Sequence, residues 1–421
     1  MGIGGARSAL VIGGGAVGLA CALRLRQRGL HTTLVDPMDS TSASLGNAGH
    51  IAIEQCAPLA SWETIRGAPR RWFGFGGALD VRAPGAFAPW LRRFVRAAAP
   101  ARFREGSDAL RGLLEHAVPS WRALVRDIGR PDLLAEDGHV VLWESPRTAD
   151  RCNAAWRAAD IGTATLRGLD PAELDSYGLL LRHRPAGGIR FAGTGQIVDL
   201  TQLMLAMRQA FAARGGVCTQ DRVLSLRVRD GRAEALLAGG DPCSADIVLV
   251  AAGVQSAELM ATVGPRPPLI AERGYHVQWS AHDWPAVSSP VVFEDRSMIV
   301  TRFRDGLRAA SFVEFAKPHS PPDPRKWAAL RRHVAEVGLP TSGEGREWFG
   351  SRPTLPDYLP AIGHSPAASN LLYAFGHQHL GLTLAPITAE AVASLVTGDA
   401  PPVPLRAFDL QRFHSTAGSR T

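Results

Sequence analysis

The chain has 421 residues, of which 46% are hydrophobic and 20% charged; this composition excludes a disordered chain and allows two globular domains. The net charge of +7 comes almost entirely from scattered arginines, which argues against nucleic acid as the main partner. Five dispersed cysteines indicate neither a disulfide framework nor a metal site, and no run of about 20 apolar residues is free of charge, so we expect no membrane span.

Residues 9–36 predict a strand, a glycine turn, a helix and a second strand. The apolar run 9–12 leads into the pattern G-x-G-x-x-G, formed by Gly13, Gly15 and Gly18. In such a unit the glycines allow a tight turn, the approach of a pyrophosphate to the backbone and close packing of the helix on the strand. The helix start, with Ala16 and Val17, would present free N–H groups to the phosphates.

Asp36 ends the second strand about 20 residues after the glycines, where a carboxylate binds a ribose hydroxyl. An acidic residue here disfavours the 2′-phosphate of NADP, so NAD and FAD both remain open on this stretch. The alternative is an ordinary strand–helix–strand unit with a glycine-rich turn. That alternative does not explain why three glycines and the acid keep this spacing.

The next segment, residues 40–50, is rich in small residues and predicts a loop. Its Asn47, Ala48 and Gly49 leave the backbone accessible, as in FAD folds where a loop here runs beside the flavin; a plain surface loop is the alternative. Downstream we expect a mainly helical region at 58–135, a strand at 139–143, a helix at 151–166, short strands at 187–191 and 196–200, and an amphipathic helix at 199–214.

An apolar strand at 245–253, ending in Ala252 and Gly253, returns the chain to the first sheet after a long insertion. By analogy with known folds this late return favours FAD over NAD. Residues 275–279, 291–293, 298–303 and 308–315 predict antiparallel strands, and 327–337 predicts a helix.

These patterns predict an α/β fold with a split Rossmann-type FAD-binding domain and an α+β substrate domain whose sheet is mainly antiparallel. We assign residues 1–57, 196–268 and 350–400 to the first domain and 58–195 and 269–349 to the second. The proline-rich end, 401–421, predicts a frayed tail. Before it, residues 376–382 lead into a helix at 386–396, whose N-terminus could face a flavin or a substrate carboxylate.

Taken together, the motifs resemble the D-amino-acid oxidase/dehydrogenase family, which includes the glycine and sarcosine oxidases. The residues that carry the resemblance are 13–18, 44–49 (SLGNAG), 251–253, Arg352-Pro353 and Gly376-His377. Within the family, GYH at 274–276 and ASFVEF at 310–315 look like the bacterial D-amino-acid dehydrogenases. The run GHQHLGLTLAP at 376–386 looks like the D-hydroxyproline dehydrogenases.

The resemblance implies a role for each matching position. Arg352 would clamp the substrate carboxylate, because a planar charged fork suits bidentate capture. Its polar partner would be Tyr275 or His276, and His379 stands where glycine oxidases have an arginine. The cofactor-binding residues it implies are Gly13, Gly15, Ala16, Val17, Gly18, Asp36, Asn47, Ala48, Gly49, Val223, Ala252, Gly253, Gly376, His377, Gly381 and Leu382.

Two departures from the family pattern concern the flavin. Sarcosine oxidases carry an oxygen-activating lysine where this chain has Arg308, which favours a quinone or a partner protein over oxygen as electron acceptor. No cysteine lies near the C-terminal loop, so we expect non-covalent FAD. His50 follows the flavin loop and is an alternative covalent site, but a solvated loop histidine is the preferred interpretation.

The predicted function is FAD-dependent oxidation of a D-amino acid, in particular a cyclic one such as D-proline or cis-4-hydroxy-D-proline, by hydride transfer from Cα to the flavin. Alternatives are a sarcosine- or glycine-type N-alkyl amino acid oxidase, a non-catalytic flavoprotein of an electron-transfer complex, and an NAD-dependent dehydrogenase. We expect a cytoplasmic protein whose basic surface also allows peripheral contact with the inner membrane.

Overall fold

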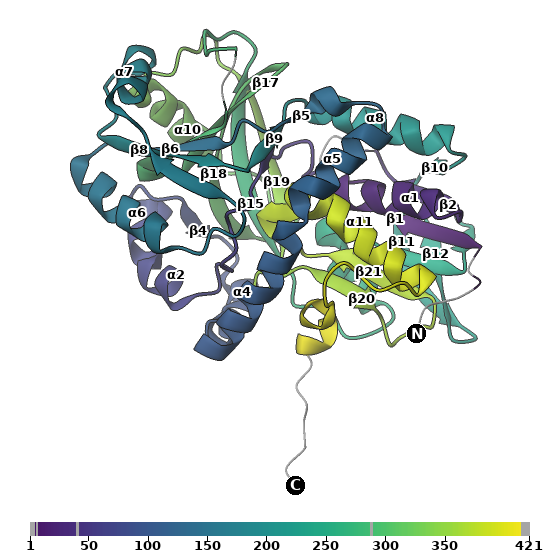
Figure 1. Ribbon diagram of the computed structural model, residues 1–421. Helices are drawn as coiled ribbons and strands as arrows, with labels where there is room; N and C mark the ends of the chain where they lie inside the picture. The colour runs from purple at the N-terminus through teal and green to yellow at the C-terminus, as the bar shows by residue number, and fades with distance from the viewer. Residues whose placement is uncertain (1–4, 6, 39–41, 287–288, 414–421) are drawn as a thin grey trace.

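The computed structural model describes residues 5, 7–38, 42–286 and 289–413. Two main sheets lie side by side, each with its own covering helices (Figure 1). They correspond to the two kinds of sheet expected, one mainly parallel and one mainly antiparallel.

The first sheet contains the glycine-rich unit and runs in the order β10-β2-β1-β14-β21-β20. Its strands are β1 (Ser8–Ile12), β2 (His31–Asp36), β10 (Val217–Gln220), β14 (Ile247–Val250), β20 (Ala361–His364) and β21 (Leu371–Phe375). All neighbours pair in parallel except β20 and β21. Three segments far apart in sequence therefore build one Rossmann-type sheet, as the late apolar strand predicts.

One face of this sheet is covered by α1 (Ala16–Gln27), α8 (Leu200–Ala213) and α11 (Gly381–Thr397). A smaller sheet of β11 (Val223–Arg229), β12 (Arg232–Leu237) and β13 (Pro242–Ser244) packs with the other face, together with α9 (Ser256–Ala261). Apolar side chains fill both interfaces, so the nucleotide-binding strands are buried on two sides.

The helical segment Gln378–Thr397, which consists of a short 3-10 turn followed by α11, is long and apolar enough to cross a membrane by length and composition alone. However, 78% of its most apolar 18-residue stretch is buried, and α11 packs against α1 and α5 (Ala117–Asp127). Helix α11 begins at Gly381, five residues before the predicted start at Pro386. The proline therefore lies inside the helix, near its N-terminal end. The apolar composition of α11 is explained by its place in the core.

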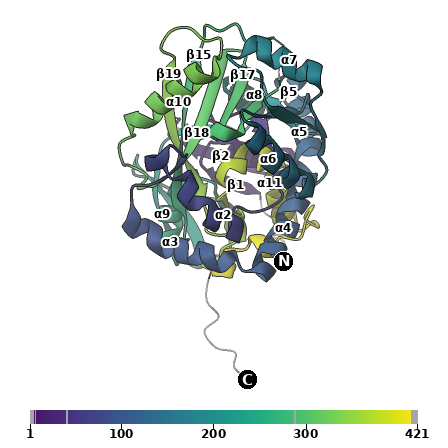
Figure 2. The same ribbon diagram turned by 90° about the vertical axis from the view of Figure 1, so that its left-hand side faces the viewer.

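The second sheet runs in the order β19-β15-β18-β17-β16-β6-β8-β7, and β4 pairs with β18. Its strands are β4 (Leu79–Val81), β6 (His139–Trp143), β7 (Thr165–Gly168), β8 (Gly187–Ala192), β15 (Ile270–Trp279), β16 (Val291–Phe293), β17 (Met298–Phe303), β18 (Gly306–Ala316) and β19 (Arg346–Thr354). Helix α10 (Pro324–Val337) packs on β15 and β18 (Figure 2). A small sheet of β3 (His50–Ile51), β9 (Gly195–Ile197) and β5 (Leu134–Ala135) lies between the two large ones.

The remaining helices come mostly from the region predicted to be helical. They are α2 (Trp62–Gly67), α3 (Pro84–Ala97), α4 (Pro100–Glu115), α6 (Pro146–Ala158) and α7 (Pro171–Leu180). Although α4 and α5 belong to a segment assigned to the substrate domain, they pack into the core of the first domain. Trp121 of α5, for example, donates from Nε1 to the carbonyl oxygens of Leu382 and Thr383.

Three sequence predictions need correction. The helix expected at 151–166 ends at Ala158, and its last residues instead enter β7. The domain boundary expected at residue 350 falls inside β19, which pairs with β15 along its whole length. The expected frayed tail is packed up to residue 413: Phe408 is fully buried, and Tyr373 donates its hydroxyl to Asp409. The remainder, 414–421, lies outside the described residues.

Candidate active site

The glycine turn after β1 is sterically locked against its neighbours. Gly13 has φ +104°, and a Cβ there would lie 2.5 Å from the carbonyl oxygen of Ala251. A Cβ on Gly18 would lie 1.9 Å from the carbonyl oxygen of Gly13. The 251–253 segment, with Ala252 and Gly253, is thereby held beside the turn. Only glycine fits these positions, as the dinucleotide-binding interpretation requires.

Asp36 is placed beside this turn. Its carboxylate accepts from the backbone N–H of Gly14 at 2.6 Å and pairs with Arg208 of α8 at 3.3 Å. The second guanidinium nitrogen of Arg208, Nη1, is buried and has no partner among the described residues. An unpartnered donor next to Asp36, the acid expected to bind ribose, and next to a helix N-terminus fits the adenosine diphosphate half of FAD. Val223 is the first residue of β11. It follows Gln220, the last residue of β10 and the strand partner of Asp36, by three positions, so the chain reaches Val223 from the edge strand next to Asp36.

The flavin loop, which we define as residues 44–49, runs from the helix start to the second sheet. Ser44 accepts at Oγ from the N–H of Ala16, 2.9 Å away, and therefore caps α1. Arg308 of β18 donates from Nη1 to the carbonyl oxygens of Leu45 and Asn47. The buried guanidinium of Arg308 is thus engaged with the loop, and its burial lowers its pKa to about 10.

Arg352 lies on β19 directly opposite Glu272 of β15. Its Nη1 donates to Glu272 at 3.1 Å and to the carbonyl oxygen of Phe312 at 3.2 Å. Nη2 and Nε have no hydrogen-bond partner among the described residues, and the side chain is 27% exposed. A Cβ on Gly274 would lie 2.3 Å from Nη2, so the missing side chain makes room for the guanidinium.

The network behind Arg352 contains backbone strain. Buried Glu272 also accepts from Thr354 at 3.1 Å and from the hydroxyl of Tyr358 at 2.9 Å. Phe312, Tyr358 and Gln378 have φ values of +70°, +56° and +48°, which non-glycine residues rarely adopt. Phe312 contacts Arg352 through its carbonyl, and Gln378 donates to the carbonyl of Tyr358. Strained residues gathered around one open guanidinium are typical of a functional site.

Tyr275 is one of the two expected polar partners of Arg352, the other being His276, and the structure places it away from the guanidinium. Its side chain is buried on the other face of β15 against Trp327 of α10, and its hydroxyl donates to Glu314. That hydroxyl also accepts from the N–H of Asp323. Because neighbouring strand residues point to opposite faces, Tyr275 and His276 cannot both face the same site. We therefore assign Tyr275 a structural role.

His276 faces the flavin loop. Its ring stacks on Trp348 at 4.9 Å, and its Nδ1 lies 3.2 Å from the carbonyl oxygen of Gly46. A Cβ on Gly46 would lie 2.0 Å from the Trp348 ring. Burial holds the pKa of His276 well below its usual value, so the imidazole is neutral. It is therefore suited to positioning the loop rather than to accepting a proton.

The C-terminal loop brings His379 and His377 toward the same region. The pKa of His379 is lowered to about 4, mainly by burial; nearby Glu272 raises it and Arg352 lowers it. The Nε2 atom of the ring is hydrogen-bonded to the side chain of Gln55. His377 is fully buried and bonds Thr388, and burial lowers its pKa to about 3. Gly376 has φ +81°, while Gly381 and Leu382 begin α11. Both histidines are neutral at neutral pH, which argues against either as a strong base.

His50 differs from the expected solvated loop residue. It lies in β3 with a side chain only 8% exposed, close to Glu54 and His139. Sequence reasoning also missed Glu272, Arg208 and Trp348. No sequence motif marked them, because each acts through a partner more than 70 positions away or on another element.

A family model described as FAD dependent oxidoreductase matches residues 8–395. The chain belongs to this family. A D-amino-acid oxidase of Bradyrhizobium diazoefficiens is 31% identical over 97% of this chain and 99% of its own length. A D-amino acid dehydrogenase of Cereibacter sphaeroides is 28% identical over 96% of this chain and 95% of its own.

The fold is also similar to that of solved oxidases. Glycine oxidase from Geobacillus kaustophilus matches with a TM-score of 0.71 and 21% identity, covering 97% of this chain and 99% of that one. Iminodiacetate oxidase from Chelativorans matches with a TM-score of 0.71, covering 95% and 98%. The predicted family, the fold class, the FAD cofactor and the enzymatic nature of the chain are thereby confirmed.

Proposed function

We propose that this FAD-dependent oxidoreductase oxidises a D-amino acid at Cα, with a cyclic one such as D-proline or cis-4-hydroxy-D-proline as preferred substrate. The observation that carries the proposal is Arg352, which is held through Nη1 while Nη2 and Nε stay open among the described residues. Two adjacent N–H groups of one guanidinium match the two oxygens of a carboxylate. The relatives named for D-amino acids support the same class of substrate.

The chain's residues would orient the substrate for the cofactor. Arg352 would fix the carboxylate, and the flavin loop held by Arg308 would fix the cofactor's position relative to it. FAD, when bound, supplies the acceptor for the hydride from Cα. His276 and His379 are neutral and weakly basic, so neither would take a proton from the substrate ammonium group. The substrate would instead lose that proton to solvent and bind with a neutral amine.

A cyclic substrate is supported by one aromatic wall. Trp348 packs against the flavin loop at Gly46 and stacks on His276. Two further aromatic residues of the second sheet are packed into the cores instead: Trp279 donates to the carbonyl oxygen of Gly343, and Phe315 packs on Trp90. The likeness of 376–386 to D-hydroxyproline dehydrogenases adds to this support.

The position of Arg308 supports a dehydrogenase rather than an oxidase. The guanidinium replaces the oxygen-activating lysine of the sarcosine oxidases and is already bonded to the flavin loop. We therefore propose a quinone or a partner protein as electron acceptor, reached from the cytoplasm or at the surface of the inner membrane.

Anaerobic mixing of the FAD-loaded protein with a panel of D- and L-amino acids, sarcosine and glycine tests the proposal. We expect D-proline and cis-4-hydroxy-D-proline to bleach the flavin, and the reduced protein to be reoxidised faster by a soluble quinone than by oxygen. Bleaching by sarcosine alone, with rapid reoxidation by oxygen, would instead identify an N-alkyl amino acid oxidase. Yellow protein that no amino acid bleaches would identify a non-catalytic flavoprotein.

A further inference from the structure

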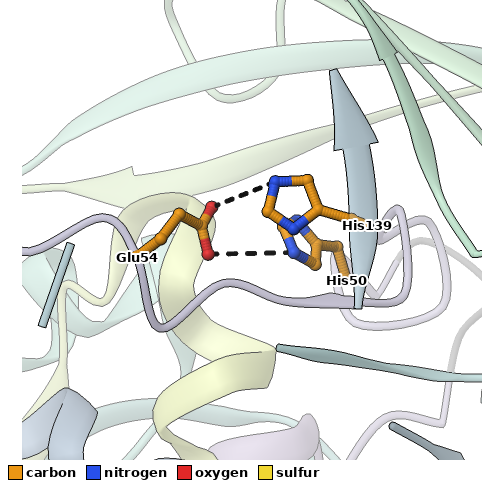
Figure 3. A group of neighbouring side chains, drawn as sticks. All are labelled: His50, Glu54 and His139. Carbon is orange, nitrogen blue, oxygen red and sulfur yellow. Dashed lines mark ion pairs between the residues drawn. The ribbon is translucent and has the colours of Figure 1, made fainter. Parts of the chain in front are cut away.

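Three potential metal ligands meet where the flavin loop enters the space between the two large sheets. His50 lies on β3, Glu54 in the turn that follows it, and His139 on β6 of the second sheet. One donor atom from each lies within 4.8 Å of the others, and the carboxylate faces both imidazole rings (Figure 3). These residues serve no step of the proposed amino acid oxidation.

The distances within this group leave a gap between the donors. Glu54 Oε2 lies 3.9 Å from His50 Nε2, and Glu54 Oε1 lies 4.0 Å from His139 Nε2. Both separations are too long for hydrogen bonds. Two ligands of a tetrahedral zinc ion, each about 2.1 Å from it, are about 3.4 Å apart. Each of these two carboxylate–imidazole separations would therefore need to shorten by only about half an ångström to reach the spacing of zinc ligands.

Burial makes the open donors unusual. The side chains of His50, Glu54 and His139 are 8%, 2% and 2% exposed. His50 Nε2 and Glu54 Oε2 are buried without a hydrogen-bond partner among the described residues. Buried polar atoms normally have a hydrogen-bond partner, and a site for a bound ion is one of the standard reasons when they have none in the protein.

The ring of His139 is already oriented as a metal ligand would be. Its Nδ1 lies 3.0 Å from the hydroxyl of Thr194, and its face stacks on Phe191 at 4.4 Å. These contacts leave Nε2 directed at Glu54. Metal-binding histidines are typically held in this way by a second polar group on the other ring nitrogen.

A second buried group of acids shows what a satisfied site looks like in this fold. Asp80, Glu314 and Asp323 also lie close together, but the ammonium of Lys326 sits among them, 2.6 Å from Asp80 and from Glu314. That group already contains its cation. No lysine or arginine pairs with Glu54 among the described residues.

We propose that His50, Glu54 and His139 bind one divalent transition-metal ion of the zinc type. Two imidazoles and one carboxylate form a zinc ligand set that leaves a fourth position for water. Because the ligands come from β3, the adjoining turn and β6, the ion would tie the segment after the flavin loop to the second sheet. The turn also carries Gln55, which bonds His379, so the ion would stabilise one wall of the candidate active site.

The test is equilibrium dialysis of the chelator-treated, FAD-loaded full chain against Zn²⁺, with the bound metal measured by mass spectrometry. We expect one bound zinc per chain and a Tm that rises with zinc concentration. His139→Asn keeps a polar group near Thr194 but removes Nε2; it should weaken zinc binding by at least the roughly 10–100-fold that loss of a supporting partner costs. Glu54→Gln should also weaken it.

His333→Asn is the matched control. His333 is likewise partly buried with an unpartnered ring nitrogen among the described residues, but it belongs to no group of three donors there. This variant should bind zinc as the wild type does. Absence of stoichiometric zinc in the wild type, or equal binding by wild type and His139→Asn, would overturn the proposal. Neither result depends on amino acid turnover, so the proposed oxidation is tested separately.

Discussion

Replacing Arg352 by lysine tests how the substrate carboxylate is held. Lysine keeps the positive charge beside Glu272 but cannot present two N–H groups in one plane. One charge-assisted hydrogen bond contributes about 1.5–3 kcal/mol. Because the Arg352 side chain is 27% exposed and water weakens the interaction, we expect the lost binding free energy to lie toward the lower end of this range. About 2 kcal/mol corresponds to a roughly 30-fold lower kcat/KM.

The assay is steady-state oxidation of D-proline with an artificial electron acceptor, together with the ratio of flavin to protein absorbance. We expect the loss to appear mainly in KM while FAD remains bound. Arg412→Lys is the matched control, because Arg412 pairs with Asp357 at 2.6 Å and makes no hydrogen bond to Arg352, Glu272 or Phe312 among the described residues. An unchanged kcat/KM in Arg352→Lys, or an equal loss in Arg412→Lys, would refute the assignment of Arg352.

Three further predictions concern the cofactor and the core. Gly18→Ala should lower FAD binding and the free energy of unfolding by at least about 1–3 kcal/mol, because its Cβ would lie 1.9 Å from a carbonyl oxygen; flavin content and urea unfolding measure this. Arg308→Lys should raise the FAD dissociation constant about tenfold through loss of contacts to the flavin loop, measured by titration of the apoprotein. His377 has a pKa lowered to about 3, so the unfolded chain binds more protons below about pH 6.5, and stability should fall on acidification. Its contribution is roughly 1 kcal/mol lower at pH ~5.5 than at pH ~7; His377→Gln should remove that part of the pH dependence of unfolding, whereas an unchanged profile would contradict the argument.

The parts of the fold that the sequence predicts well depend on local patterns. The glycine turn and the helices expected at 199–214 and 327–337, observed as α8 and α10, are determined by residues within a few positions of one another. The split of the first sheet is also predictable, because the 245–253 run has the apolar composition of a buried parallel strand. Arg352 was found through its motif rather than through its surroundings.

The parts that the sequence does not predict depend on pairing between distant segments. Strand register alone places Glu272 opposite Arg352, and no local signal marks it. The motif GYH offers Tyr275 and His276 as alternative partners of Arg352, and strand alternation, which places their side chains on opposite faces of β15, decides between them. His50 looked solvated because nothing near it in sequence shows that β9 and His139 cover it.

The central claim is that an FAD-dependent site built around Arg352 oxidises D-amino acids. Anaerobic stopped-flow mixing of the holoenzyme with D-proline and, in parallel, with L-proline measures it most directly through the rate of flavin reduction. The account predicts rapid, saturable reduction by the D-enantiomer and a much slower reaction with the L-enantiomer. Equal rates for the two enantiomers, or reduction by the L-enantiomer alone, would contradict it.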